Sequence, residues 1–389
     1  MPKHEERVAN YNKLSARLRD MPDEEVAKLL ASGKLVDSSM GAYALEIDGT
    51  PVFAKQIAIS DLELANKKSD GSFSTANIFN LPICYQYAFN SAGFGAGREL
   101  AAHEMTTNWV LNGQCPNFPI TYGYKMIDRN PAQDLPSEAQ RAEFKKYWNG
   151  SEEIENRMDA LDGAKKSVVV FMESIPQTLS SYIHPKKEEE RKPDMVKAEE
   201  GIIKTTAFLE SQGMMHFDAH SGNILVDYEG QVCFADFGMA LSKDFELSAE
   251  EIKFLEDNSG YDRSQALSSL CRHPKDKVTK AELPILPEVK EMSERYEPIS
   301  REFKKFSDAF KDDETKSVRY PAKEMSELYL TIKNSFKELP TEEKNEFAKK
   351  FSSSKKVKEF EDVGNDSKKS WADKISDSKR AKDDSVIKR

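Results

Sequence analysis

The chain has 389 residues, of which 38% are hydrophobic and 32% charged, and its formal net charge is −10. This length leaves room for one bilobal domain with an appendage, or for two ordinary domains. The negative charge argues against broad electrostatic attraction to nucleic acid, and no apolar run approaches the roughly 20 residues of a membrane-spanning helix.

The N-terminal part reads first as helix and then as strand. Residues 1 to about 30 have apolar side chains at helical spacing, and Pro22 is placed to open a second helix. The pattern then favours two strands, 43–47 and 52–59, around an Asp48-Gly49 turn. We therefore expect a short helical extension followed by a β-hairpin.

The middle of the chain mixes irregular, helical and extended segments. Residues 60–97 have no clear period and read as an insertion or a mobile loop. The segments expected after them are a helix at 98–112, an extended piece at 119–122, a charged helical stretch at 137–162 and a buried strand at 167–172.

The last part begins with a helix at 194–212 that Gly213 is expected to cap. Two short strands, 224–226 and 232–235, follow around a Glu229-Gly230 turn. Another helix is expected to begin near Ser248. From about Ser352 the chain becomes a charged tail to which we assign no structure.

The cysteines exclude one kind of site. Cys84, Cys115, Cys233 and Cys271 lie far apart and form no C-x-x-C pair. This spacing argues against structural zinc and predicts reduced, buried thiols in a cytosolic setting.

Three polar residues carry the strongest chemical signal. Asp218 and Asn223 stand in His216-Phe-Asp-Ala-His-Ser-Gly-Asn223, and Asp236 opens Asp236-Phe-Gly238 thirteen residues later. The predicted hairpin between them would bring Asn223 and Asp236 to one mouth, where both can reach a divalent ion. A carboxylate, metal ligands and a cation on the phosphates are what phosphoryl transfer from ATP requires.

These motifs resemble those of the protein-kinase-like superfamily. The resemblance spans about residues 33–275 and is strongest at 200–240. It implies an α+β, bilobal fold with a small β-rich N-lobe and a helical C-lobe, and the cofactors ATP and Mg²⁺ or Mn²⁺. By resemblance Asp218 is the catalytic aspartate, Asn223 and Asp236 are metal ligands, and His216 braces the catalytic loop.

The phosphate-binding end is less complete in the sequence. Lys55 in Val52-Phe-Ala-Lys55 resembles the phosphate-binding lysine of kinases. The Ser38-Ser-Met-Gly41 turn, with Ser39 and Gly41 as candidate nucleotide contacts, stands where the glycine-rich loop belongs but lacks G-x-G-x-x-G. The resemblance also places Glu173 and Ile175 in the hinge, whose backbone would meet adenine.

The lysine needs a carboxylate partner on a helix. Glu99 and Glu104 are five positions apart and therefore point about 140° away from each other, so they cannot share the role. The resemblance favours Glu99, and Glu104 is the alternative.

Two features depart from typical protein kinases. His220 stands where those enzymes carry lysine, as in aminoglycoside and choline kinase relatives and many bacterial kinase-like proteins. After Gly238 there is no Ala-Pro-Glu motif and no obvious activation segment. The resemblance is therefore to an atypical bacterial kinase, for which a secreted effector is one setting.

The sequence predicts an ATP- and Mg²⁺-dependent kinase whose first-choice acceptor is protein Ser/Thr. The alternatives are a small-molecule kinase, acting on aminoglycosides, choline, lipids or inositols, a nucleotidyltransferase, and a nucleotide-binding pseudokinase scaffold. Anionic lipid or inositol phosphate is a candidate partner of the tail's basic residues. A cytoplasmic location is expected, with leaderless export to a host cell and peripheral membrane association as the alternative.

The expected organisation follows from these assignments. Its parts are an N-terminal helical extension (1–32), a kinase N-lobe with insertions (33–172), a C-lobe catalytic core (173–280), a helical C-terminal region (281–350) and a charged tail (351–389).

Overall fold

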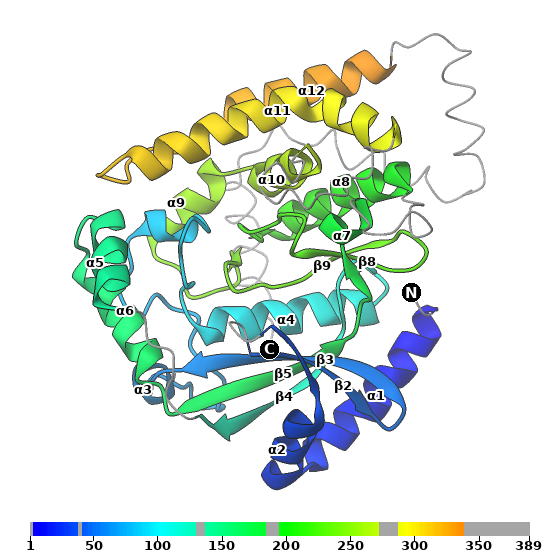
Figure 1. Cartoon of the computed structure of the whole chain (residues 1–389), viewed down its shortest axis with the longest axis vertical. Helices are drawn as coiled ribbons and strands as arrows, with labels where there is room; N and C mark the ends of the chain where they lie inside the picture. Colours follow the sequence, from blue (N-terminus) through cyan, green and yellow to red (C-terminus); the bar gives the residue numbers. More distant parts are fainter. Residues whose placement is uncertain (1–2, 38–40, 130–136, 184–193, 272–286, 338–389) are drawn as a thin grey trace, which may run out of the picture. The chain divides into compact units, whose positions relative to one another are not determined.

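A computed structural model describes residues 3–37, 41–129, 137–183, 194–271 and 287–337 (Figure 1). The chain forms one compact unit, Met1–Leu328, and a second unit, Tyr329–Arg389. The first unit contains a β-rich N-terminal lobe and a helical C-terminal lobe, so the expected α+β class is confirmed. The predicted tail, 351–389, lies outside the described residues.

The N-terminal lobe is built on a five-stranded antiparallel sheet with the order β1-β2-β3-β5-β4. The strands are β1 (Lys34–Asp37), β2 (Ala42–Ile47), β3 (Thr50–Ile59), β4 (Thr121–Asp128) and β5 (Lys166–Glu173). The β2–β3 turn is Asp48-Gly49, as predicted, and both residues have the positive φ that a tight hairpin needs.

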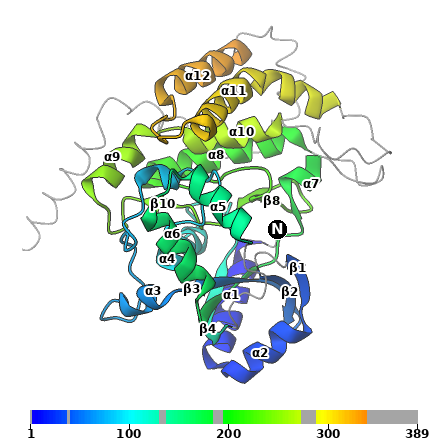
Figure 2. The same cartoon turned by 60° about the vertical axis from the view of Figure 1, so that its left-hand side comes forward.

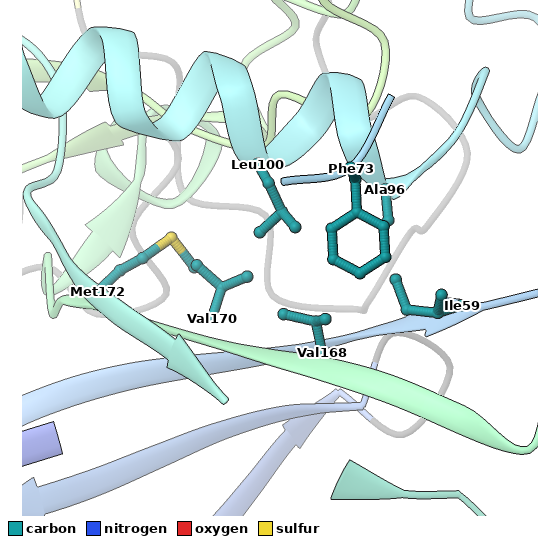
Figure 3. Packing of buried hydrophobic residues seen from close by; sticks show 7 residues of the cluster. All are labelled: Ile59, Phe73, Ala96, Leu100, Val168, Val170 and Met172. Carbon is teal, nitrogen blue, oxygen red and sulfur yellow. The ribbon is translucent and has the colours of Figure 1, made fainter. Parts of the chain in front are cut away.

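Helices cover both faces of this sheet. α4 (Ala96–Leu111) packs on one face, where Phe73 and Leu100 meet Ile59, Val168 and Val170 (Figure 3). Successive strand residues point to opposite faces, so Val169 and Phe171 face the other way, and they are fully buried as well. That second face carries α1 (His4–Asp20) and α2 (Asp23–Ser32), and Pro22 is the N-cap of α2, as expected.

Two insertions flank α4. The segment 60–95 contains α3 (Asp61–Ala65) and a 3₁₀ turn η1 (Ile83–Gln86), and Tyr85, Gln86 and Tyr87 in it are completely buried. The mobile-loop reading of this region is therefore wrong, because side chains from both lobes pack around it. The charged stretch at 137–162 forms two helices, α5 (Glu138–Tyr147) and α6 (Glu152–Asp162) (Figure 2).

The C-terminal lobe is mostly helical. Its elements are β6 (Gln177–Thr178), α7 (Leu179–Ile183), α8 (Met195–Gln212), β7 (Met214–Met215), β8 (Ile224–Val226), β9 (Val232–Phe234), β10 (Leu241–Ser242), α9 (Ala249–Asp257), α10 (Tyr261–Leu270), α11 (Pro287–Asp312) and α12 (Ala322–Lys337). The predicted helix before Gly213 is confirmed, and Gly213 caps it at φ 71°. The predicted start at Ser248 is also confirmed, because the Ser248 side chain caps α9.

An aromatic cluster joins the first insertion to the C-terminal lobe. The ring of Tyr87 contacts those of Phe217, Phe254, Tyr261 and Phe306 at centroid distances of 5.1–6.3 Å. Phe217 lies next to Asp218, so this cluster supports the loop that carries the predicted catalytic residue.

The structure bears on the state of the cysteines and on membrane-spanning helices. All four cysteines are free; Cys115 and Cys233 are buried, whereas Cys84 and Cys271 are half-buried. Among the described residues, no helix is both long and apolar enough to span a bilayer.

Candidate active site

Lys55 stands at the centre of the charged site. It lies on β3 opposite Ala42 of β2 and Val170 of β5, so strands on both sides fix its position. Its Nζ lies 2.8 Å from Glu99 Oε1 and 2.7 Å from Asp236 Oδ1. The structure thus brings together residues 181 positions apart, from strand, helix and loop.

The charges of this cluster hold one another in the ionised form. Burial alone lowers the pKa of Lys55, but the carboxylates of Glu99 and Asp236 raise it above its ordinary value. Burial alone would raise the pKa of Asp236, but Lys55 brings it down to about 2. The pKa of Glu99 is lowered too, against the effect of burial, by the same lysine. At neutral pH the cluster is one cation between two carboxylates.

The partner of Lys55 is Glu99, which is buried, and not Glu104, which is exposed. His103, one helical turn after Glu99, places Nε2 3.9 Å from Glu99 Oε1. Gly238 is close to both acids, since a Cβ there would lie 3.4 Å from Asp236 Oδ1 and from Glu99 Oε2. A larger side chain at this position would press on the cluster.

Asp218 and Asn223 form the second part of the site. Asn223 Nδ2 donates to Asp218 Oδ2 at 2.8 Å and to Asp218 O at 3.0 Å, which directs its amide oxygen away from Asp218. The β8–β9 hairpin then pairs Ala235 N with Asn223 O at 2.9 Å. Asn223 and Asp236 therefore leave the hairpin at the same end, as the sequence predicted.

His216 and Asp262 hold the loop that carries Asp218 through hydrogen bonds to its backbone. Asp262, at the start of α10, accepts hydrogen bonds from the amides of His216 at 2.7 Å and Phe217 at 2.8 Å. His216 Nε2 lies 2.9 Å from Ala235 O and must donate to it, because a carbonyl can only accept. Its Nδ1 is then the acceptor for Asp218 N at 3.3 Å. Phe217 has a φ of 58°, a strained value that these bonds maintain.

Asp218 is in a different electrostatic state from Asp236. Burial, followed by the nearby charge on Asp236, raises the pKa of Asp218 to about 8. The two acids repel each other, and Lys55 is already shared between Asp236 and Glu99. An additional cation at this position would be stabilised by both acids.

The residues present fit Mg²⁺ bound with a nucleotide. Mg²⁺ prefers oxygen ligands and usually takes one or two protein groups, with phosphates and water completing its shell. The amide oxygen of Asn223 and the carboxylate of Asp236 are such a pair. Within the described ranges, no group of three or more His, Cys, Asp and Glu residues could hold a metal on its own.

The predicted nucleotide contacts precede β2 in the chain or stand at the end of β5. Gly41 has a φ of 55°, and its carbonyl accepts from Gln56 N at 3.1 Å, next to Lys55. Ser39 lies outside the described residues. Glu173 ends β5, and Ile175 follows in the short link to β6. The amide of Glu173 donates to Ile120 O at 2.8 Å, which ties the end of β5 to the residue before β4.

The first insertion holds the Asp236-Phe-Gly238 turn in place. Gln86 Nε2 donates to Met239 O at 2.5 Å. Gly93, at φ 74°, packs so closely that a Cβ there would lie 2.4 Å from Gly238 O. The α4 residue Arg98 pairs with Glu251 of α9 and donates to Thr75 O at 2.8 Å. Only ten residues separate Gly238 from the first residue of α9, Ala249.

The sequence reasoning missed several of these supports. Asp262 near a helix start is typical of an exposed carboxylate that favours the helix dipole, so its buried role left no signal. Arg98 stands beside Glu99, but a charged helix residue is rarely buried unless paired, and its partner Glu251 lies 153 positions away. Long-range partners of this kind are not visible in a single sequence.

Comparison with known proteins supports the family resemblance over part of the chain. Residues 149–254 match the family of protein tyrosine and serine/threonine kinases. A segment of 68 residues is 34% identical to the serine/threonine-protein kinase PKH3 of Saccharomyces cerevisiae, over 18% of this chain and 8% of that protein. The chain thus spans a small part of the length of this curated relative.

A likeness to a solved structure is weak. The structure of the yeast RNA polymerase II CTD kinase CTDK-1 complex matches 52% of this chain and 44% of its own with 13% identity and a TM-score of 0.26, which adds nothing to the family match. The family match and the site geometry support the protein-kinase-like superfamily.

Proposed function

We propose that the protein is a kinase that transfers the γ-phosphoryl group of ATP to a hydroxyl acceptor with the help of Mg²⁺. The observation that carries the proposal is the contact of Lys55 with both Glu99 and Asp236, beside the Asp218–Asn223 pair. A merely structural ion pair would need neither the second acid nor the adjacent carboxamide. The kinase family match over residues 149–254 supports the same reaction class.

Each residue has a role in this proposal. Mg²⁺-ATP would supply the electrophilic phosphoryl group, and metal ions neutralise charge that develops on it. Lys55 binds the phosphates, and Glu99 keeps the lysine ammonium ordered. Asn223 Oδ1 and the Asp236 carboxylate hold the metal. Asp218 orients the acceptor hydroxyl and accepts its proton.

The atom of Asp218 that does this is Oδ1. Asn223 donates to Oδ2, whereas Oδ1 lies 3.7 Å from His220 Nε2. His220 Nδ1 accepts from Gly222 N at 2.9 Å, so in the neutral ring the proton is on Nε2, on the side of Asp218. His220 thereby becomes a candidate donor to an acceptor or phosphate oxygen next to Asp218.

Protein Ser/Thr is our first choice of acceptor, since the partial matches are to protein kinases. A small-molecule kinase is the second candidate, favoured by His220 and by the short connection between Gly238 and α9, which leaves little chain for a peptide-docking platform. Anionic lipid or inositol phosphate binding was predicted from tail residues outside the described ranges and stays a prediction. The cytoplasmic or exported setting, bacterial origin included, also stays a proposal.

The test is to follow labelled ATP with the wild type and Asp218→Asn. Purified protein is incubated with γ-labelled ATP and Mg²⁺ or Mn²⁺, alone, with cell extract, and with hydroxylated metabolites. We expect label in protein and at least about 10²-fold less with the variant if Asp218 is the base. Retained turnover in a folded Asp218→Asn protein would contradict its role.

The same experiment separates the alternatives. Label in a small molecule would select the second candidate. Transfer from α-labelled instead of γ-labelled ATP would indicate nucleotidyl transfer. ATP binding with no transfer to any acceptor, the protein included, would identify a pseudokinase scaffold and end the proposal.

A further inference from the structure

The side chain of Arg7 on α1 is buried at the end of β5, and its hydrogen-bond partners lie more than 100 positions along the chain. Its side chain is only 3% exposed. Nε lies 3.1 Å from Glu173 Oε1 and Nη2 2.7 Å from Glu173 Oε2. Nη1 donates to Pro116 O at 2.9 Å, and Nη2 to Phe118 O at 2.6 Å.

This pattern uses the specific shape of arginine. A planar guanidinium can grip a carboxylate with two parallel bonds and still donate to carbonyl groups on either side, whereas a lysine has one compact ammonium group. Burying a charge is unfavourable unless it is paired and hydrogen-bonded, and here each nitrogen of Arg7 has an acceptor. The buried ion pair of α1 is therefore the one between Arg7 and Glu173.

The contacts of Arg7 connect it to two parts of the proposed nucleotide site, the end of β5 and the strand before Asp236. Glu173 Oε2 also accepts from Ile120 N at 3.2 Å, which fixes the last residue of β5. Between the two carbonyls bound by Arg7 lies Asn117, whose own carbonyl accepts from Phe234 N at 2.9 Å. Phe234 precedes Asp236 by two residues. Arg7 therefore holds a loop that touches both the hinge strand and the strand leading to the metal-binding acid.

We propose that Arg7 is a positioning residue of the nucleotide site: through Glu173 it sets where the hinge backbone presents itself to adenine. This inference rests on the proposed ATP-dependent function. It makes the N-terminal helix α1 a part of nucleotide recognition and not only a cover for the sheet. Arg7 does not itself touch the reacting groups, so its substitution affects nucleotide affinity more than turnover.

The test compares Arg7→Lys with Arg17→Lys, a matched change on the same helix at a part-exposed arginine that pairs with Glu25. Binding of a fluorescent ATP analogue, displacement by adenosine and by ATP, and KM and kcat are measured for each. We expect Arg7→Lys to weaken ATP and adenosine by a similar factor of about 5–10, as for one or two lost hydrogen bonds, with kcat within about twofold. Arg17→Lys should leave all of these within about twofold.

The equal effect on adenosine is the decisive part, because a disturbance at Lys55 would weaken ATP and spare adenosine. Glu173→Gln is the second variant should Arg7→Lys fail to fold, and it is expected to weaken both ligands similarly. In the double variant the losses should not add, since both residues act through one contact.

The outcomes separate the two proposals. Wild-type protein that binds ATP, with Arg7→Lys and Glu173→Gln binding as tightly, would overturn this inference and leave the proposed function standing. A fall in kcat with unchanged affinities would overturn it too. Wild-type protein that binds no nucleotide would end the proposed function and this inference together.

Discussion

The Lys55 cluster and the Asp218 loop contain the same kinds of acid in opposite electrostatic states. In the cluster, a lysine holds the pKa of Asp236 at about 2 despite its burial. In the loop, burial and the charge on Asp236 raise the pKa of Asp218 to about 8. The hydrogen bond from Asn223 and the more distant Lys55 lower it only in part.

The difference shows which half of the site is complete in the protein alone. The cluster is charge-balanced by its own cation, so its geometry is maintained without any ligand. The loop is held by backbone hydrogen bonds to Asp262, and Lys55, which lowers the pKa of Asp218, is engaged by Glu99 and Asp236. A bound divalent ion would therefore change the protonation of Asp218. The Lys55 cluster is preorganised by its charges, and the loop that carries Asp218 is preorganised by backbone hydrogen bonds.

Removal of the cation is the strongest challenge to this contrast. Lys55→Met leaves two acids, Glu99 and Asp236, facing each other in a buried place. We expect activity to fall by about 10²-fold or more, because the positive charge that binds the phosphates is lost. We also expect unfolding at pH 7 to become easier by about 3–5 kcal/mol, the usual cost of breaking a buried pair from one side. Urea unfolding and the labelled-ATP assay measure these effects.

A lysine on the neighbouring strand provides the control. Lys166 of β5 pairs with Asp128 at the surface, and Lys166→Met should change stability by no more than about 0.5 kcal/mol. If Lys55→Met were as mild as Lys166→Met, the cluster would not be the charge-organised half of the site.

The pH dependence of stability sharpens the comparison within the loop. Burial lowers the pKa of His216 to about 4 from an unfolded value of 6.5, so the unfolded chain binds more protons between these values. This contribution is therefore complete above pH 6.5 and is lost as the pH falls toward 4. Burial raises the pKa of Asp262 from 3.8 to about 7, so its contribution is complete below pH 3.8 and is lost as the pH rises through 7.

Between pH 4 and 6.5 the two contributions change with pH in opposite directions, and each changes by about 3 kcal/mol over the whole window. Relative to the wild type, His216→Gln should make stability fall more steeply with rising pH, and Asp262→Asn should make it fall less or rise. Urea midpoints at several pH values give the slopes. Parallel curves for all three proteins would show that neither group titrates in this window.

How much the sequence could predict differs between the same two regions. Asn223 and Asp236 flank the short β8–β9 hairpin, so their spacing predicted that they meet, whereas the role of Asp218 came from the resemblance. Lys55 and Glu99 came from a resemblance and from helix geometry. Arg7, Arg98 and Asp262 could not be found, because Arg7 and Arg98 pair with carboxylates more than 150 positions away, Asp262 binds amides 45 and 46 positions away, and local patterns carry no information on such pairs.

The first insertion is the other element that the sequence did not resolve. Residues 60–95 have no clear period because only the short α3 and η1 are helical, and the rest follows the surfaces of both lobes. Their burial depends on α9, α10 and α11, and therefore on a fold that must already be known.

A glycine in that insertion tests whether the Lys55 cluster depends on it. Gly93→Ala places a Cβ 2.4 Å from Gly238 O and requires a φ of 74° that L-residues disfavour. We expect a loss of about 1–2 kcal/mol in stability and a several-fold loss of activity, as the Asp236 turn shifts. Gly113→Ala is the control, since its φ of 69° is similar and its Cβ would meet no atom within 4 Å. Equal activity of the two variants would mean that the turn is held by other contacts.

The smallest expected effect is at Glu104, five residues after the acid that binds Lys55. Its side chain is exposed, so Glu104→Gln should change stability by less than about 0.5 kcal/mol and activity by less than about twofold. Glu99→Gln has the same change in chemistry but removes the buried partner 2.8 Å from Lys55 Nζ, and the lysine is then left with Asp236 alone. We expect that variant to retain its fold and to bind ATP more weakly, measured by displacement of a fluorescent analogue. The pair of variants tests the contact with Lys55, because both changes are on α4 and both remove the same charge at the same side-chain length. If the two glutamines behaved alike, the ordering of Lys55 would come from Asp236, and the charge-organised half of the site would reduce to a single ion pair.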